Sequence, residues 1–296
     1  MATYVVDQNR MRKPELQTLI TQEPDARFVI PDVAFVEMSK NETHWKDTMR
    51  SSLVPLRPAV QRTVLSLSVG EAMSIELASG RAIDAEALLP EKFAHFVQEL
   101  VVELDEARTG NALSTLGARF ANARAALGAH ELDAEGRKAT IEGIEKSLRR
   151  DLKPEVLKAL RSNQFDPDFR LAFIQSYVQQ LLFPEEMEKA GMSETDATAF
   201  KAEQPMVLRY WYLLTRHAVD WMTSGGLSGI KATKELNHLL DMDYAAIASY
   251  FDGLLSEDEA AMAAYNDLRQ MLDTSEEDAV AAYKSVFDQV FPDHTT

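Results

Sequence analysis

The chain has 296 residues, of which 46% are hydrophobic, and it carries a formal net charge of −16. This length and apolar content are enough for one large domain or two smaller ones with a proper core. The absence of cysteine excludes disulfides, thiolate zinc sites and a cysteine nucleophile. The negative charge argues against a broad basic face for nucleic acid, because Lys and Arg provide most of that affinity by neutralising phosphates.

The first residues show no basic region followed by an apolar segment, as a secretory signal would. No stretch of the sequence approaches the roughly 20 apolar residues that a membrane span requires. We therefore expect a soluble, cytoplasmic protein that makes no membrane contact.

The N-terminal part is predicted to form two strands, each followed by a helix. Tyr4–Val6 is a short β-branched and aromatic run that ends at Asp7, and Pro14–Ile20 begins with proline, as a first helical turn often does. Arg27–Pro31 is a second apolar run, and Val33–Met38 continues it as a helix with the proline at the junction. Two such strand–helix pairs indicate a parallel sheet, and hence a helix-rich α/β protein.

The middle of the chain is predominantly helical in its periodicity. Leu53–Leu56 has the composition of a third short strand, whereas Thr63–Leu67 fits a strand or a helix equally well. From about residue 84 to residue 214, apolar residues recur every three or four positions, which is typical of amphipathic helices. Breaks between these helices are predicted at 109–111, 133–136, 166–168 and 183–184.

Acidic residues are concentrated at the C-terminal end. Residues 241–296 contain thirteen Asp or Glu but only two cations, Arg269 and Lys284. Such a concentration has two ordinary explanations, a solvated helix face or carboxylates gathered around a hard cation. The glycine-rich segment 223–229 is neither a P-loop nor a dinucleotide fingerprint, and we interpret it as a flexible turn.

The segment around residues 237–258 places acidic residues next to a short strand. Asp243 is predicted at a helix start, where free amides and the helix dipole favour a carboxylate. Leu254–Leu255 forms a minimal strand, with Asp258 just beyond its carboxyl end. In an open α/β sheet, ligands bind outside the carboxyl ends of the strands. Asp7 would lie at that same edge, and Glu37 could reach it from the second helix.

These motifs together resemble the PIN-domain nuclease family. The resemblance rests on Val5–Asn9, on the proline-to-glutamate element 30–37, and on 243–250 with 254–258, and it covers about residues 1–60 and 205–265. It implies a three-layer α/β/α fold with a short central parallel sheet. The long separation of Glu37 from Asp243 then requires a large helical insertion, so we expect an α/β core at 1–80 and 205–296 and an all-helical insertion at 81–204.

The resemblance also implies a site and a reaction. Asp7, Glu37, Asp243 and Asp258 would bind one or two Mg²⁺ or Mn²⁺ ions, with Asp241 as the rival of Asp243. Metal-activated water would then cut RNA, or single-stranded DNA, and the protein would act as a toxin, a defence effector or a processing enzyme. Supporting roles fall to Asn9 and Ser256 as orienting groups, and to Arg10, Arg12, Lys231 and Lys234 as substrate phosphate contacts.

The same residues also have a purely structural interpretation. The carboxylates could be turn residues, helix caps or exposed helical charges. The protein would then be a catalytically inactive, PIN-like helical scaffold that binds a protein partner or a second copy through its helical insertion or its C-terminal helix, 275–291. No histidine pair has the spacing of a zinc hydrolase, and the aromatic residues 210–212 are interpreted as core.

Overall fold

A computed structural model describes residues 1–41, 43–127, 134–161, 166–223 and 232–290. The chain is predominantly helical and contains one small, wholly parallel sheet. It divides into two compact units. Unit 1 comprises residues 1–72, 83–133 and 243–265, and unit 2 comprises residues 73–82, 134–242 and 266–296.

The sheet belongs to unit 1 and has the strand order β3-β2-β1-β4. Its strands are β1 (Thr3–Val6), β2 (Arg27–Ile30), β3 (Thr63–Leu65) and β4 (Gly253–Leu255). β1 pairs with β2 from Thr3↔Arg27 to Val5↔Val29, and with β4 from Tyr4↔Gly253 to Val6↔Leu255. The two central strands end in fully buried residues, such as Val6 and Ile30, as expected for parallel strands covered on both faces.

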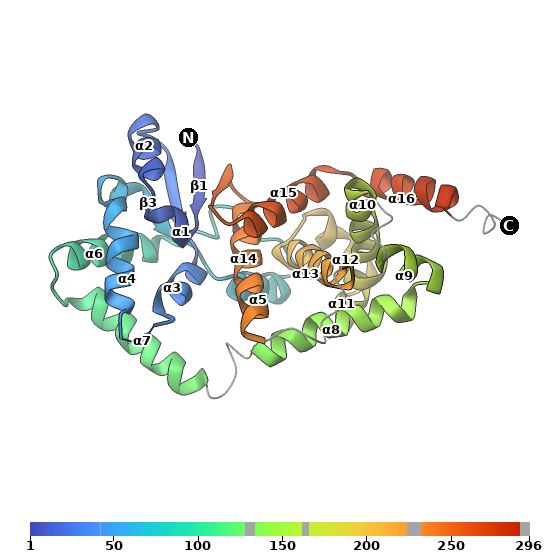
Figure 1. Ribbon diagram of the computed structural model, residues 1–296, viewed down its shortest axis with the longest axis horizontal. Coiled ribbons are helices and arrows are strands. Elements are labelled where there is room, and N and C mark those ends of the chain that lie inside the picture. Colours follow the sequence, from blue (N-terminus) through green and yellow to red (C-terminus); the bar gives the residue numbers. More distant parts are fainter. Residues whose placement is uncertain (42, 128–133, 162–165, 224–231, 291–296) are drawn as a thin grey trace. The chain divides into compact units, whose positions relative to one another are not determined.

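Helices of unit 1 surround this sheet (Figure 1). They are α1 (Gln8–Met11), α2 (Pro14–Gln22), α3 (Asp32–Ser39), α4 (Trp45–Leu53), the 3₁₀ helices η1 (Val54–Arg62) and η2 (Glu91–Phe93), α6 (Ala94–Asp105) and α7 (Asn111–Leu127). α6 packs against η1, β3, α4 and α7, and α3 packs against α4. Pro31 is the N-cap of α3, which confirms the predicted junction between the second strand and its helix.

Unit 2 is built from helices. These are α8 (Ala134–Asp151), α9 (Pro154–Arg161), α10 (Pro167–Tyr177), the π-helix η3 (Val178–Leu182), α11 (Phe183–Lys189), α12 (Glu194–Ala202), α13 (Met206–Thr223) and α16 (Glu276–Val290). Three helices begin in one unit and end in the other: α5 (Val69–Ser79), α14 (Ala232–Ala248) and α15 (Glu259–Asp273).

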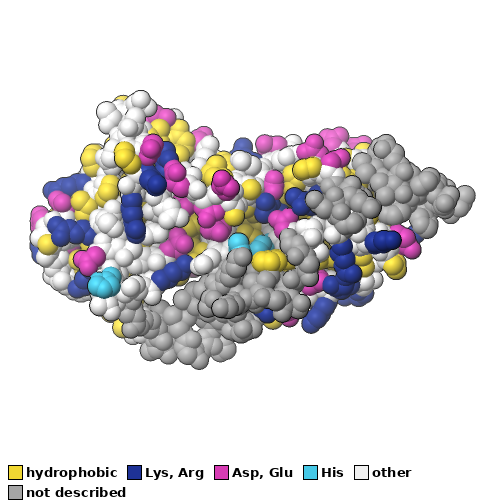
Figure 2. Space-filling model, viewed as in Figure 1, with side chains coloured by type: hydrophobic (Ala, Val, Ile, Leu, Met, Phe, Trp, Pro, Cys, Tyr) yellow, Lys and Arg dark blue, Asp and Glu magenta, His cyan; other side chains and the backbone are white. Residues whose placement is uncertain are grey.

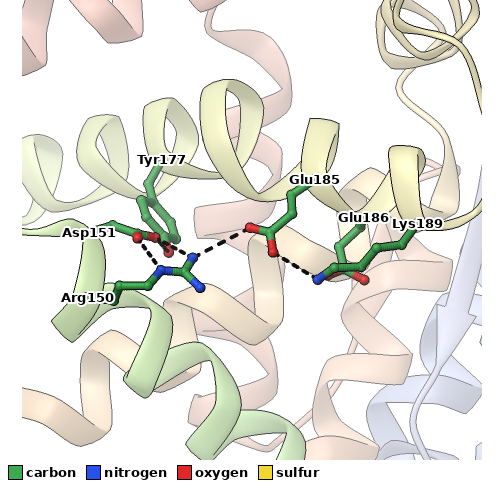
Figure 3. A network of polar contacts seen from close by, with 6 residues as sticks. All are labelled: Arg150, Asp151, Tyr177, Glu185, Glu186 and Lys189. Carbon is green, nitrogen blue, oxygen red and sulfur yellow. Dashed lines mark hydrogen bonds and ion pairs between the residues drawn. The ribbon is translucent and has the colours of Figure 1, made fainter.

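A network of polar contacts links α8, α10 and α11 in unit 2 (Figure 3). Asp151 accepts hydrogen bonds from the Arg150 guanidinium at 2.7 and 3.2 Å and from the Tyr177 hydroxyl at 2.9 Å. Arg150 also lies 3.6 Å from Glu185, which forms a 2.9 Å ion pair with Lys189. Hydrogen bonding to Arg150 holds the pKa of Asp151 below its usual range, and burial raises the pKa of Tyr177.

The observed elements differ from the predicted ones in several places. Residues 53–56 belong to α4 and η1, not to a strand, whereas the ambiguous segment 63–67 supplies β3. The predicted break at 183–184 is absent, because η3 runs directly into α11. The units also differ from the predicted division. Residues 83–133 join the sheet in unit 1, and residues 205–242 and 266–296 fall in unit 2.

The predicted glycine-rich turn at 223–229 lies almost entirely outside the described residues. Among the described residues, no helix combines the length and the apolar character that a membrane crossing requires.

Candidate active site at the end of the parallel sheet

The strand order places a topological switch point between β1 and β4. From β1 the chain moves to β2 and β3 on one side, and β4 then joins the opposite edge of β1. Open α/β sheets bind ligands outside the carboxyl ends of the strands, at the position where the strand order reverses. Asp7 directly follows β1, and Ser256 directly follows β4.

Asp7 is fixed at this switch point by several hydrogen bonds. It is the N-cap of α1, and its backbone N–H donates to the Leu255 carbonyl at 3.0 Å. Its Oδ1 accepts from the Asn9 backbone N–H at 3.3 Å, and its Oδ2 accepts from the Ser256 hydroxyl at 2.5 Å. Only 3% of Asp7 is exposed. The chain thus buries a carboxylate and surrounds it with donors.

Ser256 and Asp258 form the opposite side of the switch point. The Ser256 hydroxyl oxygen accepts the Asp258 backbone N–H at 2.9 Å. Asp258 is half-buried, and its Oδ1 accepts the backbone N–H groups of Ala260 at 2.7 Å and Ala261 at 3.1 Å. Asp258 therefore caps the first turn of α15, which is the ordinary structural use of Asp at that position.

Glu37 reaches the same region from α3 and is held by Tyr244. The Tyr244 hydroxyl donates to Oε2 of Glu37 at 2.8 Å and accepts the Gln8 backbone N–H at 3.4 Å. Lys40, the C-cap of α3, forms an ion pair with the other carboxylate oxygen, Oε1, at 3.7 Å. Tyr244 is 1% exposed and belongs to the last turns of α14.

The carboxylates influence one another electrostatically. Burial raises the pKa of Asp7 above its ordinary value, and the negative charge of Asp258 raises it further, while hydrogen bonds from Ser256 and Asn9 act in the opposite direction. Burial also raises the pKa of Glu37, and the charge of Asp7 adds to that effect. The structure therefore brings Asp7 close enough to Asp258 and to Glu37 for the charges of each pair to interact.

The other two predicted ligands lie on α14. Asp243 was expected at a helix start, but α14 begins at Ala232, so Asp243 lies well inside the helix, next to Tyr244. The apolar residues that precede Asp243 extend the helix toward its N-terminus, which overrides the capping preference of aspartate. Asp243 and Asp241 are both half-buried, and the boundary between units 1 and 2 falls between them.

The predicted phosphate-binding cations are engaged within the protein or lie outside the described side chains. Arg10 forms an ion pair with Glu257, and Nε of Arg12 donates to the Ser52 hydroxyl at 2.9 Å. Lys231 lies outside the described residues, and so does the side chain of Lys234. Figure 2 shows acidic side chains interspersed with Lys and Arg over the region of β1 and α1, without a continuous basic surface there.

The described carboxylates do not form a ready-made metal cage. Within the described part of the chain, no group of three or more His, Asp or Glu side chains is arranged to hold an ion. A pocket of about 770 Å³ occurs in unit 2, where Phe183, Lys201 and Glu276 contribute to its lining, and it contains none of the predicted site residues.

Tyr244 is the site residue that the sequence analysis did not identify. It lies four residues after Leu240 and three before Ile247, both of which are buried, so its position fits an apolar helix face.

Comparison with protein-family models, curated proteins and solved structures finds no match to this chain.

Proposed function

We propose that unit 1 is a PIN-like α/β/α nuclease core that hydrolyses phosphodiester bonds of RNA or single-stranded DNA with Mg²⁺ or Mn²⁺. The observation that supports the proposal is the position of Asp7 at the switch point of a parallel sheet, where its charge interacts with those of Glu37 and Asp258. These three side chains come from the end of β1, from α3 and from the end of β4. Asp243, beside Tyr244, is the proposed fourth carboxylate.

The chemistry of the donor set fits a hard divalent cation. Mg²⁺ and Mn²⁺ prefer carboxylate oxygens, whereas the chain has no cysteine to select a softer metal. Burial raises the pKa values of Asp7 and Glu37, and so does the charge of a neighbouring carboxylate, Asp258 for Asp7 and Asp7 for Glu37, so a cation would relieve an electrostatic cost that these residues otherwise carry. When bound, such an ion lowers the pKa of water and stabilises charge on phosphoryl oxygens.

The chain's own residues would prepare the site. Ser256 holds Oδ2 of Asp7, and Tyr244 holds Oε2 of Glu37, which restricts each carboxylate to one orientation. Arg10 is kept at the site by its ion pair with Glu257, the residue between Ser256 and Asp258. A substrate phosphate could replace Glu257 as the partner of Arg10, since guanidinium groups bind both anions in the same geometry.

A specific observation favours the second candidate, a catalytically inactive scaffold that binds a protein partner. Each of the three carboxylates already has a structural use. Asp7 caps α1, Asp258 caps α15, and Glu37 accepts the Tyr244 hydroxyl. In a scaffold these hydrogen bonds alone would explain why the three carboxylates are present, and no cation would be required.

A divalent-ion titration separates the two candidates. The full-length protein is heated with a chelator, with Mg²⁺ or with Mn²⁺, and is incubated with single-stranded RNA and DNA oligonucleotides. A nuclease gains thermal stability from the ion and shortens an oligonucleotide, and Asp7→Asn removes the cleavage without unfolding the chain. A protein that gains no stability and cleaves neither polymer is the scaffold, and retained cleavage by Asp7→Asn removes Asp7 from the mechanism.

A further inference from the structure

Tyr244 connects two parts of the candidate site that are far apart in the sequence. Its hydroxyl donates to Glu37 on α3 and accepts the backbone N–H of Gln8, the residue that follows Asp7. Both contacts lie within unit 1, and Tyr244 is almost completely buried. One phenol oxygen therefore ties the helix that carries Glu37 to the turn that carries Asp7.

This contact makes the two oxygens of Glu37 inequivalent. Oε2 accepts the Tyr244 hydroxyl at 2.8 Å, whereas Oε1 forms a 3.7 Å ion pair with the Lys40 ammonium. The Glu37 side chain is 17% exposed and that of Lys40 is 44% exposed, so a small cation can replace the ammonium without a change in the protein core. Fixing a glutamate side chain when a ligand binds costs considerable rotamer entropy. The hydrogen bond from Tyr244 already restricts Glu37 in the free protein, so part of that cost is absent from ligand binding.

Packing alone does not require the hydroxyl of Tyr244. A phenylalanine would fill nearly the same volume without burying a polar atom, and burying a hydroxyl is unfavourable unless it is hydrogen-bonded. In this position the hydroxyl has a donor on one side and a carboxylate on the other. The hydroxyl thus both donates and accepts a hydrogen bond, and the one that it donates goes to a carboxylate of the candidate site.

We propose that Tyr244 is a positioning residue that holds Glu37 by Oε2, so that a divalent cation binds Oε1 in place of the Lys40 ammonium. This inference rests on the proposed function, because it assigns Tyr244 a role in metal binding by the same site. Tyr244 acts through Glu37 and touches neither the cation nor the substrate. Hydrogen-bond partners of this kind orient ligating carboxylates, and losing one typically costs about 10–100-fold in metal affinity or activity.

The test measures Mn²⁺ affinity of the full chain by calorimetric titration, without nucleic acid. Tyr244→Phe is expected to weaken Mn²⁺ binding about 10–100-fold. In cleavage assays at fixed Mn²⁺ its turnover is expected to fall while KM for the oligonucleotide stays unchanged, and excess Mn²⁺ should restore turnover. A merely structural role would lower thermal stability but leave the Mn²⁺ affinity of the folded protein unchanged.

The matched control is Tyr177→Phe in unit 2. Tyr177 is also a buried tyrosine, and its hydroxyl donates to a carboxylate, that of Asp151, at 2.9 Å (Figure 3). Its substitution removes the same kind of hydrogen bond outside unit 1, so Mn²⁺ affinity should remain at the wild-type value. Equal losses of affinity in Tyr244→Phe and Tyr177→Phe would contradict a specific role for Tyr244.

A double-mutant cycle with Glu37→Gln tests the route of the effect. If Tyr244 acts through Glu37, Tyr244→Phe should cause little further loss of Mn²⁺ affinity in the Glu37→Gln background. Fully additive losses would overturn the inference. Wild-type protein that binds no Mn²⁺ would reject the proposed function together with this role, whereas wild-type binding that Tyr244→Phe leaves unchanged would reject the role of Tyr244 alone.

Discussion

The hydroxyl of Ser256 donates a 2.5 Å hydrogen bond to Oδ2 of Asp7 and so joins residues 249 positions apart in the sequence. Ser256 follows β4, and Asp7 follows β1, its neighbour in the sheet. The same serine oxygen accepts the Asp258 backbone N–H. A single hydroxyl therefore fixes both acidic residues at the switch point, and the geometry of the site depends on the pairing of the first and last strands.

Substituting Ser256 with alanine should destabilise the protein by about 1–3 kcal/mol, because it removes a hydrogen bond to a buried carboxylate. The pKa of Asp7 should also rise further, since the Ser256 hydrogen bond lowers it in the wild-type protein. Urea unfolding at neutral pH measures the loss. Ser51→Ala is the control, because the exposed Ser51 hydroxyl bonds only to the Thr48 carbonyl of its own helix. A similar, small effect of both variants would show that the Ser256 bond contributes little.

Asp7→Asn should make the metal-free protein more stable than the wild type at neutral pH. The folded pKa of Asp7 is raised above 3.8, mainly by burial, so the folded state binds its proton more tightly than the unfolded state does. The contribution of Asp7 to stability is therefore greatest below pH 3.8 and declines as pH rises through the folded pKa. Asparagine carries no charge and avoids that decline.

The measurement is the difference in unfolding free energy between Asp7→Asn and wild type, in a chelator, at several pH values from 4 to 7.5. The difference should move in favour of the variant as pH rises, by about 1.4 kcal/mol for each unit by which the folded pKa exceeds the ordinary value. A difference that is constant with pH would show that Asp7 titrates normally in the folded protein.

Divalent cations should reverse this order of stability. If Asp7 and Glu37 hold a cation, saturating Mg²⁺ or Mn²⁺ stabilises the wild-type protein, by about 2.7 kcal/mol at 100 times the dissociation constant. The stabilisation should shrink at acidic pH, because protons compete with the metal for carboxylates whose pKa values are raised. Thermal melting of wild type and Asp7→Asn, each with and without Mn²⁺, tests this. Equal stabilisation of both proteins would place the ion elsewhere.

The strands around the site could be predicted because their signals are local. Tyr4–Val6 and Arg27–Ile30 are compact β-branched and aromatic runs bounded by polar residues or proline, and both form buried parallel strands. The strand at 254–255 is short, but its glycine on one side and Ser256 on the other mark its ends. Acidic residues at the carboxyl ends of such strands follow directly from the sequence.

What could not be predicted depends on long-range packing. The hydrogen bond from Tyr244 to Glu37 spans 207 residues, and the periodicity of α14 makes Tyr244 resemble an ordinary core residue. Asp243 resembles a helix cap because only local preferences are visible, whereas the preceding residues extend α14 back to Ala232. The division into units is equally non-local, since α6 joins the sheet unit by packing on η1 and β3.

Alanine substitutions of Gly110, which precedes α7, and of Gly117, inside α7, should change the stability of the protein in opposite directions. The buried Glu103 carboxylate accepts the backbone N–H groups of Ala112 at 3.1 Å and Leu113 at 2.8 Å, and so caps that helix from α6. A Cβ atom at Gly110 would lie 2.1 Å from Oε1 of Glu103. Gly110→Ala therefore has to displace the capping carboxylate, and it should destabilise the protein by about 1–3 kcal/mol.

Gly117→Ala, inside α7, is the control. Its Cβ would meet only the Trp45 ring, at an ordinary contact distance of 3.8 Å. Alanine is the better helix former by about 0.5–1 kcal/mol, so this variant should be stabilised. Urea unfolding of both variants and the wild type at neutral pH measures these two changes in unfolding free energy. Equal stabilisation by the two substitutions would mean that Glu103 can leave the helix terminus without cost, and that water caps α7 equally well.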